Sequence, residues 1–295
     1  MTSIKDLPHL LHLLDDADPQ VRPAVESAFK DYDGDISDDV AALGIRMSDE
    51  VKNYLSGLLV HGRRRRLRDE WQVPTGGGRE LCDDWERFED LLGVLADFFH
   101  DGVDLRPSLP DELDLLADEL REVNANPTAD EMRKWLFAKK RYKGAAKQVD
   151  AVHHYDLCGV IESGEGNPTS LACLFMLLAR RFQLNVEGCN YPGHFLARMD
   201  VDGKAFLVDC FHSGRKFEVA ELLRKHPEIS PYAKDAASHA CPLGEILLRV
   251  VHELEHSYAA KNLDEDAALF RELRRSLDGV GEDAHAGDAK GEKGE

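Results

Sequence analysis

The chain has 295 residues, of which 43% are hydrophobic and 32% are charged, so it can build a packed core and is not disordered throughout. The 56 acidic residues outnumber the 37 Lys and Arg residues, and the formal net charge of −19 makes nucleic acid an unfavourable partner because phosphates are repelled. The longest apolar stretch, Leu171 to Ala179, is shorter than the about 20 residues that span a bilayer. We therefore expect no membrane partner.

Two further features indicate the cytoplasm. The N-terminus has no basic region before an apolar run, so no signal peptide is evident. The six cysteines, at positions 82, 158, 173, 189, 210 and 241, include no Cys-x-x-Cys pair. Such scattered cysteines are typical of reduced thiols rather than of a disulfide framework. We expect a cytoplasmic protein and no cofactor.

Apolar residues recur at helical spacing in the first part of the chain. They predict helices at 7–14, at 21–29 and at about 48–60. Asp18 can cap the second of these helices, and Pro19 suits its first turn. The string Asp-Pro-Gln-Val-Arg at this point resembles the turn between the helices of a HEAT repeat. A single good repeat is too little for a free-standing solenoid, so we expect the segment to lean on the rest of the chain.

One basic run interrupts the acidic sequence, HGRRRRLR at 61–68, with Arg63–Arg66 at its centre. The favoured interpretation is a solvated surface that offsets nearby acidic residues, and a patch for an anionic ligand stays open. The glycines of 74–80 are not followed by Lys and Ser or Thr, so they predict a loop rather than a phosphate-binding site. Amphipathic helices are predicted at 85–99 and at about 110–123.

The middle of the chain predicts a buried helix followed by a hairpin. Asn167 is a favoured N-cap residue and Pro168 a favoured first helical residue, and 169–182 are apolar nearly all round. Residues 186–199 and 205–211 read as strands joined at Asp202-Gly203, a strong hairpin dipeptide. A buried helix beside an antiparallel hairpin indicates the α+β class.

The hairpin register brings two chemical groups together. If Asp202 and Gly203 form a two-residue turn, Val201 pairs with Lys204, and His194 faces Phe211. His194 and Asp209 then become diagonal neighbours on one face of the sheet. A carboxylate in that place can hold an imidazole in one tautomer and orientation.

Three strings carry a family resemblance: GNPTSLACLF, GCNYPGHFLAR and VDCFHSG. Together they resemble the transglutaminase-like superfamily, which has the fold of papain-like cysteine peptidases, and more closely its bacterial SirB-type branch. The resemblance implies that His194 takes the position of the catalytic His and Asp209 that of the acid which orients it. The expected binding residues beside them are Asn167, Asn190 and Gly193.

The same resemblance places the nucleophile at Pro168, where the superfamily has Cys. Proline offers no nucleophile and lacks a backbone N–H, so a Cys thioester cannot form there. The leading hypothesis is therefore a module without thiol catalysis that binds a peptide, a protein or a small ligand, or regulates through it. The alternative is a hydrolase or acyltransferase with a displaced nucleophile, which would be Cys189, Thr169 or Ser170.

The C-terminal helix contains a competing motif. His252 to His256 spell H-E-x-x-H, the zinc-binding string of metalloproteases. Both His side chains fall outside the apolar stripe of the predicted helix, Glu255 lies between them, and no third ligand follows at metalloprotease spacing. We expect no metal, with His252 and His256 as weak candidates for a zinc hydrolase.

These patterns together predict four segments. They are a HEAT-like helical segment at 1–66, a transglutaminase-like domain at 67–242, a C-terminal helical segment at 243–278 and a disordered tail at 279–295.

Overall fold

The computed structural model describes residues 7–14, 21–30, 32–139, 141–146 and 151–279. The predicted cap and turn at Asp18 and Pro19 and nearly all of the tail lie outside these residues. Within them, no helix combines the length and the apolar content needed to cross a membrane.

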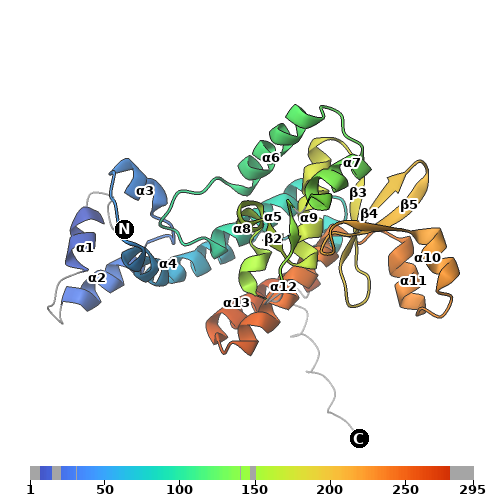
Figure 1. Cartoon of the computed structure of the whole chain (residues 1–295). Coiled ribbons are helices and arrows are strands. Elements are labelled where there is room, and N and C mark those ends of the chain that lie inside the picture. Colours follow the sequence, from blue (N-terminus) through green and yellow to red (C-terminus); the bar gives the residue numbers. More distant parts are fainter. Residues whose placement is uncertain (1–6, 15–20, 31, 140, 147–150, 280–295) are drawn as a thin grey trace, which may run out of the picture.

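Four helices form the N-terminal end of the molecule, at the left of Figure 1: α1 (Leu7–Leu13), α2 (Val21–Lys30), α3 (Ser37–Ala42) and α4 (Asp49–Glu70). They enclose a small apolar cluster of their own that includes Phe29, Leu55 and Leu59. The third predicted helix is α4, but it ends at Glu70 rather than near residue 60. The reason is that arginine is a good helix former, so the basic run continues the helix.

The basic run joins the N-terminal helices to the rest of the chain. Arg64 donates to Asp266 at 2.7 Å, and Arg68 donates to Glu272 at 3.0 Å. Arg63 is partly buried and donates to the carbonyl of Asp101 at 2.8 Å. The prediction that the run offsets acidic residues is confirmed. The prediction of a solvated surface is wrong for Arg63 and Arg64, because distant acceptors reach them only in the folded chain.

The segment between α4 and the sheet is helical. It contains η2 (Gly77–Leu81), α5 (Trp85–Phe99), α6 (Leu109–Val123), α7 (Ala129–Arg133), the π-helical turn η3 (Lys134–Ala138), β1 (Lys143–Gly144), η4 (Val152–Tyr155), α8 (Leu157–Ser163) and β2 (Glu165–Gly166). The predicted helices at 85–99 and 110–123 are α5 and α6. The predicted domain boundary between residues 66 and 67 falls inside α4, so one helix belongs to both predicted segments.

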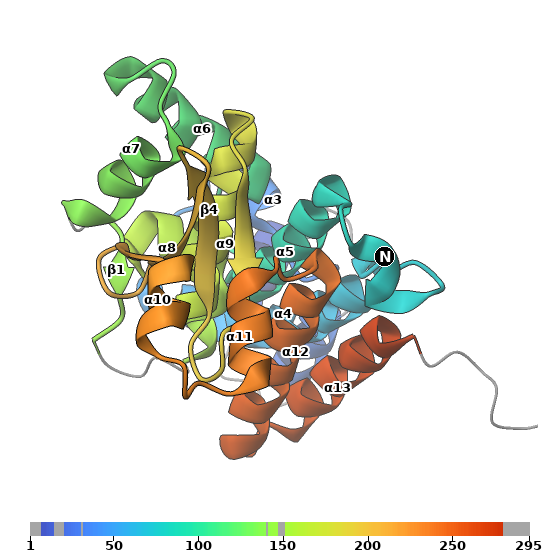
Figure 2. The same ribbon diagram turned by 90° about the vertical axis from the view of Figure 1, so that its right-hand side faces the viewer.

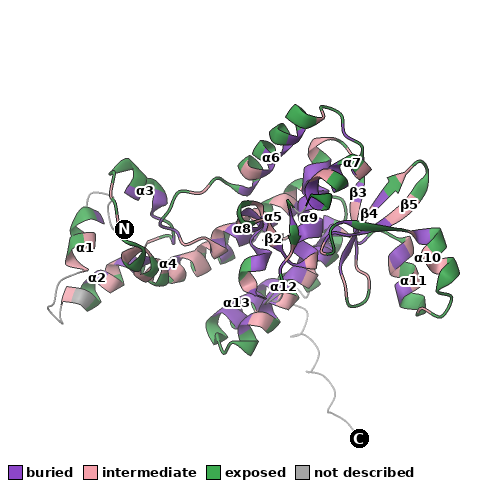
Figure 3. Cartoon of the chain, viewed as in Figure 1, coloured by how far each residue is buried: buried purple, intermediate pink, exposed green. Residues whose placement is uncertain are grey.

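Helix α9 (Pro168–Arg181) is the centre of the main core. Every residue from Thr169 to Ala179 is buried, which confirms the buried helix, and purple marks it in Figure 3. Asn167 caps its start, because the side-chain oxygen accepts from the Ser170 N–H at 2.8 Å. The capping and the apolar sequence together fix where the helix begins.

An antiparallel sheet packs on α9. Its order is β3 (Val186–Cys189), β4 (Leu196–Val201), β5 (Lys204–Asp209) and β6 (Arg215–Glu218). Val201 pairs with Lys204 as predicted, and Asp202 and Gly203 both have positive φ, as a two-residue type I′ turn requires.

The prediction of one unbroken strand at 186–199 is wrong. The chain reverses between β3 and β4, which are antiparallel neighbours. Pro192 removes a donor from the ladder, and Gly193, with φ of 76°, takes the left-handed conformation of the turn. The strand predicted at 205–211 likewise ends at Asp209.

The last four helices cover the remaining surfaces. Helices α10 (Val219–Lys225) and α11 (Pro231–Ser238) lie on the face of the sheet opposite α9, in front of β4 in Figure 2. Helices α12 (Leu243–Ala260) and α13 (Asp264–Asp278) pack on one another, and α12 packs on α5. The predicted helical region at 243–277 is therefore a pair of helices.

Candidate functional site

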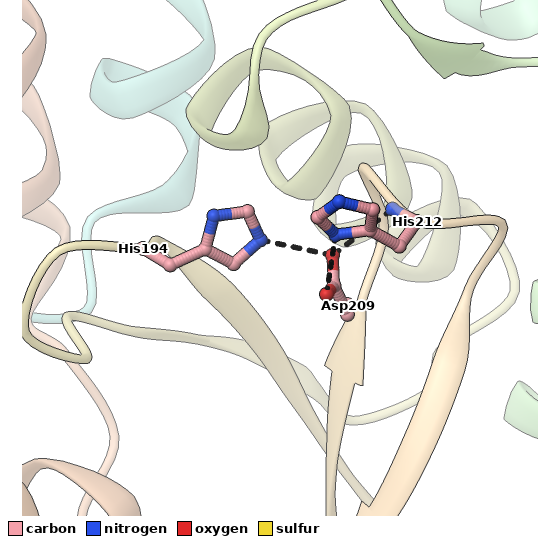
Figure 4. A group of neighbouring side chains, drawn as sticks. All are labelled: His194, Asp209 and His212. Carbon is pink, nitrogen blue, oxygen red and sulfur yellow. Dashed lines mark hydrogen bonds and ion pairs between the residues drawn. The ribbon is translucent and has the colours of Figure 1, made fainter.

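Three side chains meet where the sheet ends. His194 lies in the turn before β4, Asp209 is the last residue of β5, and His212 lies in the turn after it (Figure 4). His194 Nε2 is 2.9 Å from Asp209 Oδ1, and His212 Nδ1 is 2.8 Å from Asp209 Oδ2. The backbone N–H of His212 also donates to Asp209 Oδ1, at 3.0 Å. The contact between His194 and Asp209 follows the predicted register, whereas their catalytic roles stay a prediction.

The carboxylate of Asp209 is held in its ionised form. Burial alone would raise its pKa, but hydrogen bonds from His194 and from the backbone and side chain of His212 outweigh burial and lower the pKa to about 2. The site therefore contains a fixed negative charge between two imidazoles at neutral pH.

The site opens toward solvent on one side. The side chain of Asp209 is 12% exposed and that of His194 27%, but that of His212 is 57% exposed. Phe211 forms an inner wall, with its ring 6.1 Å from that of His194 and nearly perpendicular to it. A ligand can therefore reach the imidazoles from the His212 side without disturbing the core.

His212 was missed by the sequence reasoning. It stands three residues after Asp209 in the string VDCFHSG, a spacing that lets a turn fold the ring back onto the carboxylate. The Asp-x-x-His spacing at a strand end was the available signal. Its side chain joins the site only because the chain leaves β5 directly after Asp209.

The start of α9 connects to this site through β1. The Gly144 N–H donates to the carbonyl of Phe211 at 3.2 Å, and the Ala145 N–H donates to the carbonyl of Gly166 at 3.0 Å. Pro168 follows as the first residue of α9. Helix α9, which begins at Pro168, is thus connected through β1 to the turn that follows Asp209.

The residues around Pro168 cap the helix. Asn167 is 2% exposed, and the Ser170 hydroxyl accepts from its N–H at 3.0 Å and donates to its carbonyl at 3.2 Å. Thr169 is buried as well. Within the described residues, the ring of His194 hydrogen-bonds to Asp209 and to neither of these hydroxyls.

In the part of the chain that the structure describes, no cysteine thiol hydrogen-bonds to the ring of His194. Cys189 donates to the carbonyl of Ala236 at 3.1 Å under α11, and burial raises its pKa to about 11. Cys173 and Cys210 are buried in the main core, and burial raises the pKa of both. Burial also raises the pKa of Cys158 and Cys241, to about 12. Cys82 is the exposed cysteine.

The two remaining predicted binding residues lie in the loop between β3 and β4. Gly193 is exposed, and a side chain there would meet nothing within 4 Å. Asn190 accepts from Arg249 at 2.7 Å and lines a groove of about 650 Å³ between η2 and the last two helices. Three arginines also line this groove: Arg79, Arg249 and Arg274. His194 and Asp209 are not among its lining residues, so the loop carries Asn190 to the groove and His194 to the His–Asp pair.

The H-E-x-x-H string lies on the outside of α12. His252 and His256 are exposed, as predicted, and their rings are 4.2 Å apart. Glu255 is buried and accepts from Arg271 and Arg274, at 2.8 Å in each case. In the described part of the chain, the group able to hold a metal ion is His194, Asp209 and His212, and the string on α12 forms no such group.

Residues 108–252 match the family model of the transglutaminase-like superfamily. A UPF0162 protein of Xylella fastidiosa strain Temecula1 is 32% identical over 154 residues, which are 50% of this chain and 55% of that protein. A UPF0162 protein of strain 9a5c is 31% identical over 163 residues, which are 53% of this chain and 58% of that protein.

A UPF0162 protein of Pseudomonas aeruginosa is 32% identical over 123 residues, which are 40% of this chain and 43% of that protein. The chain thus spans about half the length of the curated relatives it matches. No solved structure matches it. The family match covers the buried helix α9, the antiparallel sheet and the contact between His194 and Asp209. Residues 108–252 therefore form a domain of the transglutaminase-like superfamily.

Proposed function

We propose that the chain is a transglutaminase-like module without thiol catalysis, which binds a peptide, protein or small ligand at the surface formed by the His194–Asp209 pair and the loop of Asn190. One observation carries this proposal. The His–Asp pair is complete, with 2.9 Å between its atoms, while the helix start that should supply a thiol begins with Pro168. A retained pair beside a lost nucleophile suits recognition better than acyl transfer.

The positions of the cysteines support the first half of the proposal. Covalent catalysis needs the nucleophile within hydrogen-bond reach of its base, and Cys189 instead donates to the carbonyl of Ala236. A raised pKa also keeps its thiol protonated at neutral pH, whereas a reactive thiol needs a lowered one.

The groove supports the second half. Its volume of about 650 Å³ lies in the usual range of ligand sites, which is about 300–1,000 Å³. Asn190 and Arg249 stand on its wall, hydrogen-bonded at 2.7 Å, so a fixed amide and a guanidinium face any occupant. The loop that carries Asn190 also carries His194, so one loop links the groove to the His–Asp pair.

The finer assignments belong to the same proposal. The three strings around α9, β4 and β5 favour the SirB-type branch, and the helices α1 to α4 favour a HEAT-like attachment to it. A cytoplasmic location and a regulatory role are parts of this proposal too.

Cysteine alkylation tests the absence of thiol catalysis. The rate at each of the six cysteines is measured by mass spectrometry from pH 5 to 9, in the wild type and in His194→Ala. We expect Cys82 to react first, because it is exposed, with the same pH profile in both proteins. A thiol that reacts fast near pH 6 and slows in His194→Ala would support the displaced-nucleophile enzyme instead.

Peptide selection tests the binding half. A displayed library of random peptides is selected on the wild type, and the recovered peptides are measured against His194→Ala and Asn190→Ala. We expect peptides whose affinity falls about tenfold or more in at least one variant, the equivalent of losing one good contact. If every recovered peptide binds both variants as tightly as the wild type, the binding surface is elsewhere.

A further inference from the structure

We infer that His194, Asp209 and His212 form a binding site for a divalent transition-metal ion such as Zn²⁺. This inference rests on the function proposed above and deepens it, since it names an occupant for the His194–Asp209 part of the proposed binding surface. It depends on the geometry of the three side chains and on the chemistry of their donor atoms.

The donor set is one that such ions prefer. Two imidazole nitrogens and one carboxylate oxygen are the ligands of many zinc sites and of non-haem iron sites with open positions. The donor atoms of His194, Asp209 and His212 all lie within 4.8 Å of one another. Ligands bound to zinc at about 2.1 Å are roughly 3.4 Å apart in a tetrahedron, so side-chain shifts on the order of 1 Å bring all three onto one ion.

The backbone gives these side chains room to make that shift. His194 and His212 both stand in turns, one before β4 and one after β5, while Asp209 is anchored at the end of a strand. The strand thus fixes the carboxylate, and the two turns let the imidazoles adjust around it. The exposure of His212, at 57%, leaves coordination positions open to water or to a ligand.

Other His pairs in the molecule provide an internal comparison. The rings of His153 and His154 are 4.1 Å apart, and those of His252 and His256 are 4.2 Å apart, closer than the 5.5 Å between His194 and His212. Within the described residues, the pair on α12 has no third donor in reach, whereas Asp209 stands between the rings of His194 and His212. Two close imidazole rings are therefore not sufficient for a metal site. The carboxylate of Asp209 distinguishes the pair of His194 and His212.

The net charge of the molecule favours the attraction of cations to its surface in general. The chain has a net charge of −19, which raises the concentration of cations at its surface. Three protein ligands leave at least one position free on a four-coordinate ion. The bound ion would then present that position to an anionic or carbonyl group of the ligand.

Metal titration tests the inference. Tag-free protein is treated with a chelator, dialysed and titrated with ZnCl₂ by calorimetry, and bound zinc is counted by mass spectrometry. We expect one ion per chain in the wild type and an affinity at least about tenfold lower in His212→Ala, because one ligand is lost. The double variant His252→Ala/His256→Ala is the matched control and should bind zinc like the wild type.

Two further measurements keep the result interpretable. His212→Asp supplies another ligand type at the same exposed turn and should recover part of the affinity, which mere loss of folding would not allow. Titration with Co²⁺ should give visible absorption bands in the wild type that are absent in His212→Ala.

Absence of stoichiometric zinc, or equal affinity in His212→Ala, would overturn the inference, and loss of zinc only in the α12 double variant would move the site to the H-E-x-x-H string. The cysteine alkylation experiment does not depend on a bound metal. A negative zinc titration would therefore leave the proposal that thiol catalysis is absent untouched.

Discussion

Two regions of the molecule contain a pair of histidines with a buried carboxylate nearby, and they use it differently. At the end of the sheet, Asp209 lies between His194 and His212 and contacts both. On α12, Glu255 lies between His252 and His256 in the sequence, but it turns away from them to Arg271 and Arg274. The comparison teaches that spacing along a helix groups residues by face, whereas a site needs side chains that converge from separate elements.

The largest effect should come from restoring the missing thiol. In Pro168→Cys the new side chain stands at the start of α9, where the helix dipole favours a thiolate, and a His194 ring that faces it would favour the thiolate further. We expect the new cysteine to be alkylated at pH 6 about 10–100-fold faster than Cys82 in the same protein. The double variant Pro168→Cys/His194→Ala should lose most of this advantage. Equal rates in the two variants would show that the His–Asp pair does not face this helix start.

Removal of the Asp209 carboxylate should have the next largest effect, a loss in the free energy of unfolding. Asp209→Ala loses three hydrogen bonds to a largely buried group, so we expect the free energy of unfolding to fall by about 2 kcal/mol. Asp235→Ala is the matched control, since Asp235 also pairs with a histidine, His239, but both side chains are 72% exposed. Its cost should stay below about 0.5 kcal/mol in urea unfolding. Similar costs for the two variants would contradict the special position of Asp209.

A smaller, pH-dependent effect is expected from Glu255. Burial raises its pKa, but hydrogen bonds from Arg274 and Arg271 outweigh burial and lower it. A lowered pKa in the folded state stabilises the protein above the unfolded value of about 4.3, and this stabilisation is lost as the pH falls further. Glu255→Gln should therefore lower the free energy of unfolding by about 1 kcal/mol at pH 7, as measured by urea unfolding. The difference in this free energy between the variant and the wild type should shrink below pH 4. If the difference in free energy of unfolding stays constant from pH 7 to 3, the ionised carboxylate of Glu255 does not stabilise the fold.

The smallest effect should come from the histidines of α12. Both rings are exposed, so His252→Ala/His256→Ala should change the free energy of unfolding by less than about 0.5 kcal/mol. Thermal and urea unfolding measure this change. A loss above about 1 kcal/mol would show that the pair contributes to the fold and would end its use as a neutral control.

Local sequence signals predicted much of the fold. The capped and apolar stretch after Asn167 specifies α9, and the dipeptide Asp202-Gly203 fixes the turn and the register of β4 with β5. That register brings the start of β4 beside the end of β5, and His194, two residues before β4, contacts Asp209, the last residue of β5. These features depend on neighbours in the sequence, which is why they could be read from it.

Other features depend on contacts between distant segments. Arg64 hydrogen-bonds to Asp266, and the Cys189 thiol hydrogen-bonds to the carbonyl of Ala236. Both partners are distant in the sequence, so the surroundings of Arg64 and Cys189 could not be predicted from the local pattern. The segment at 186–199 was predicted as one strand although Pro192 and Gly193 are local turn signals, and the pairing of β3 with β4 shows that the chain reverses there. Sequence periodicity reports which face is apolar but not which element will cover it.

The sequence by itself determined the α+β class, the buried helix and the contact between His194 and Asp209, because caps, turns and periodicity act over a few residues. The tertiary structure alone decided that five of the six cysteines are buried and that the groove beside Asn190 forms between η2 and the last two helices. Those features arise where segments far apart in the chain pack together, and packing of that kind has no local signature.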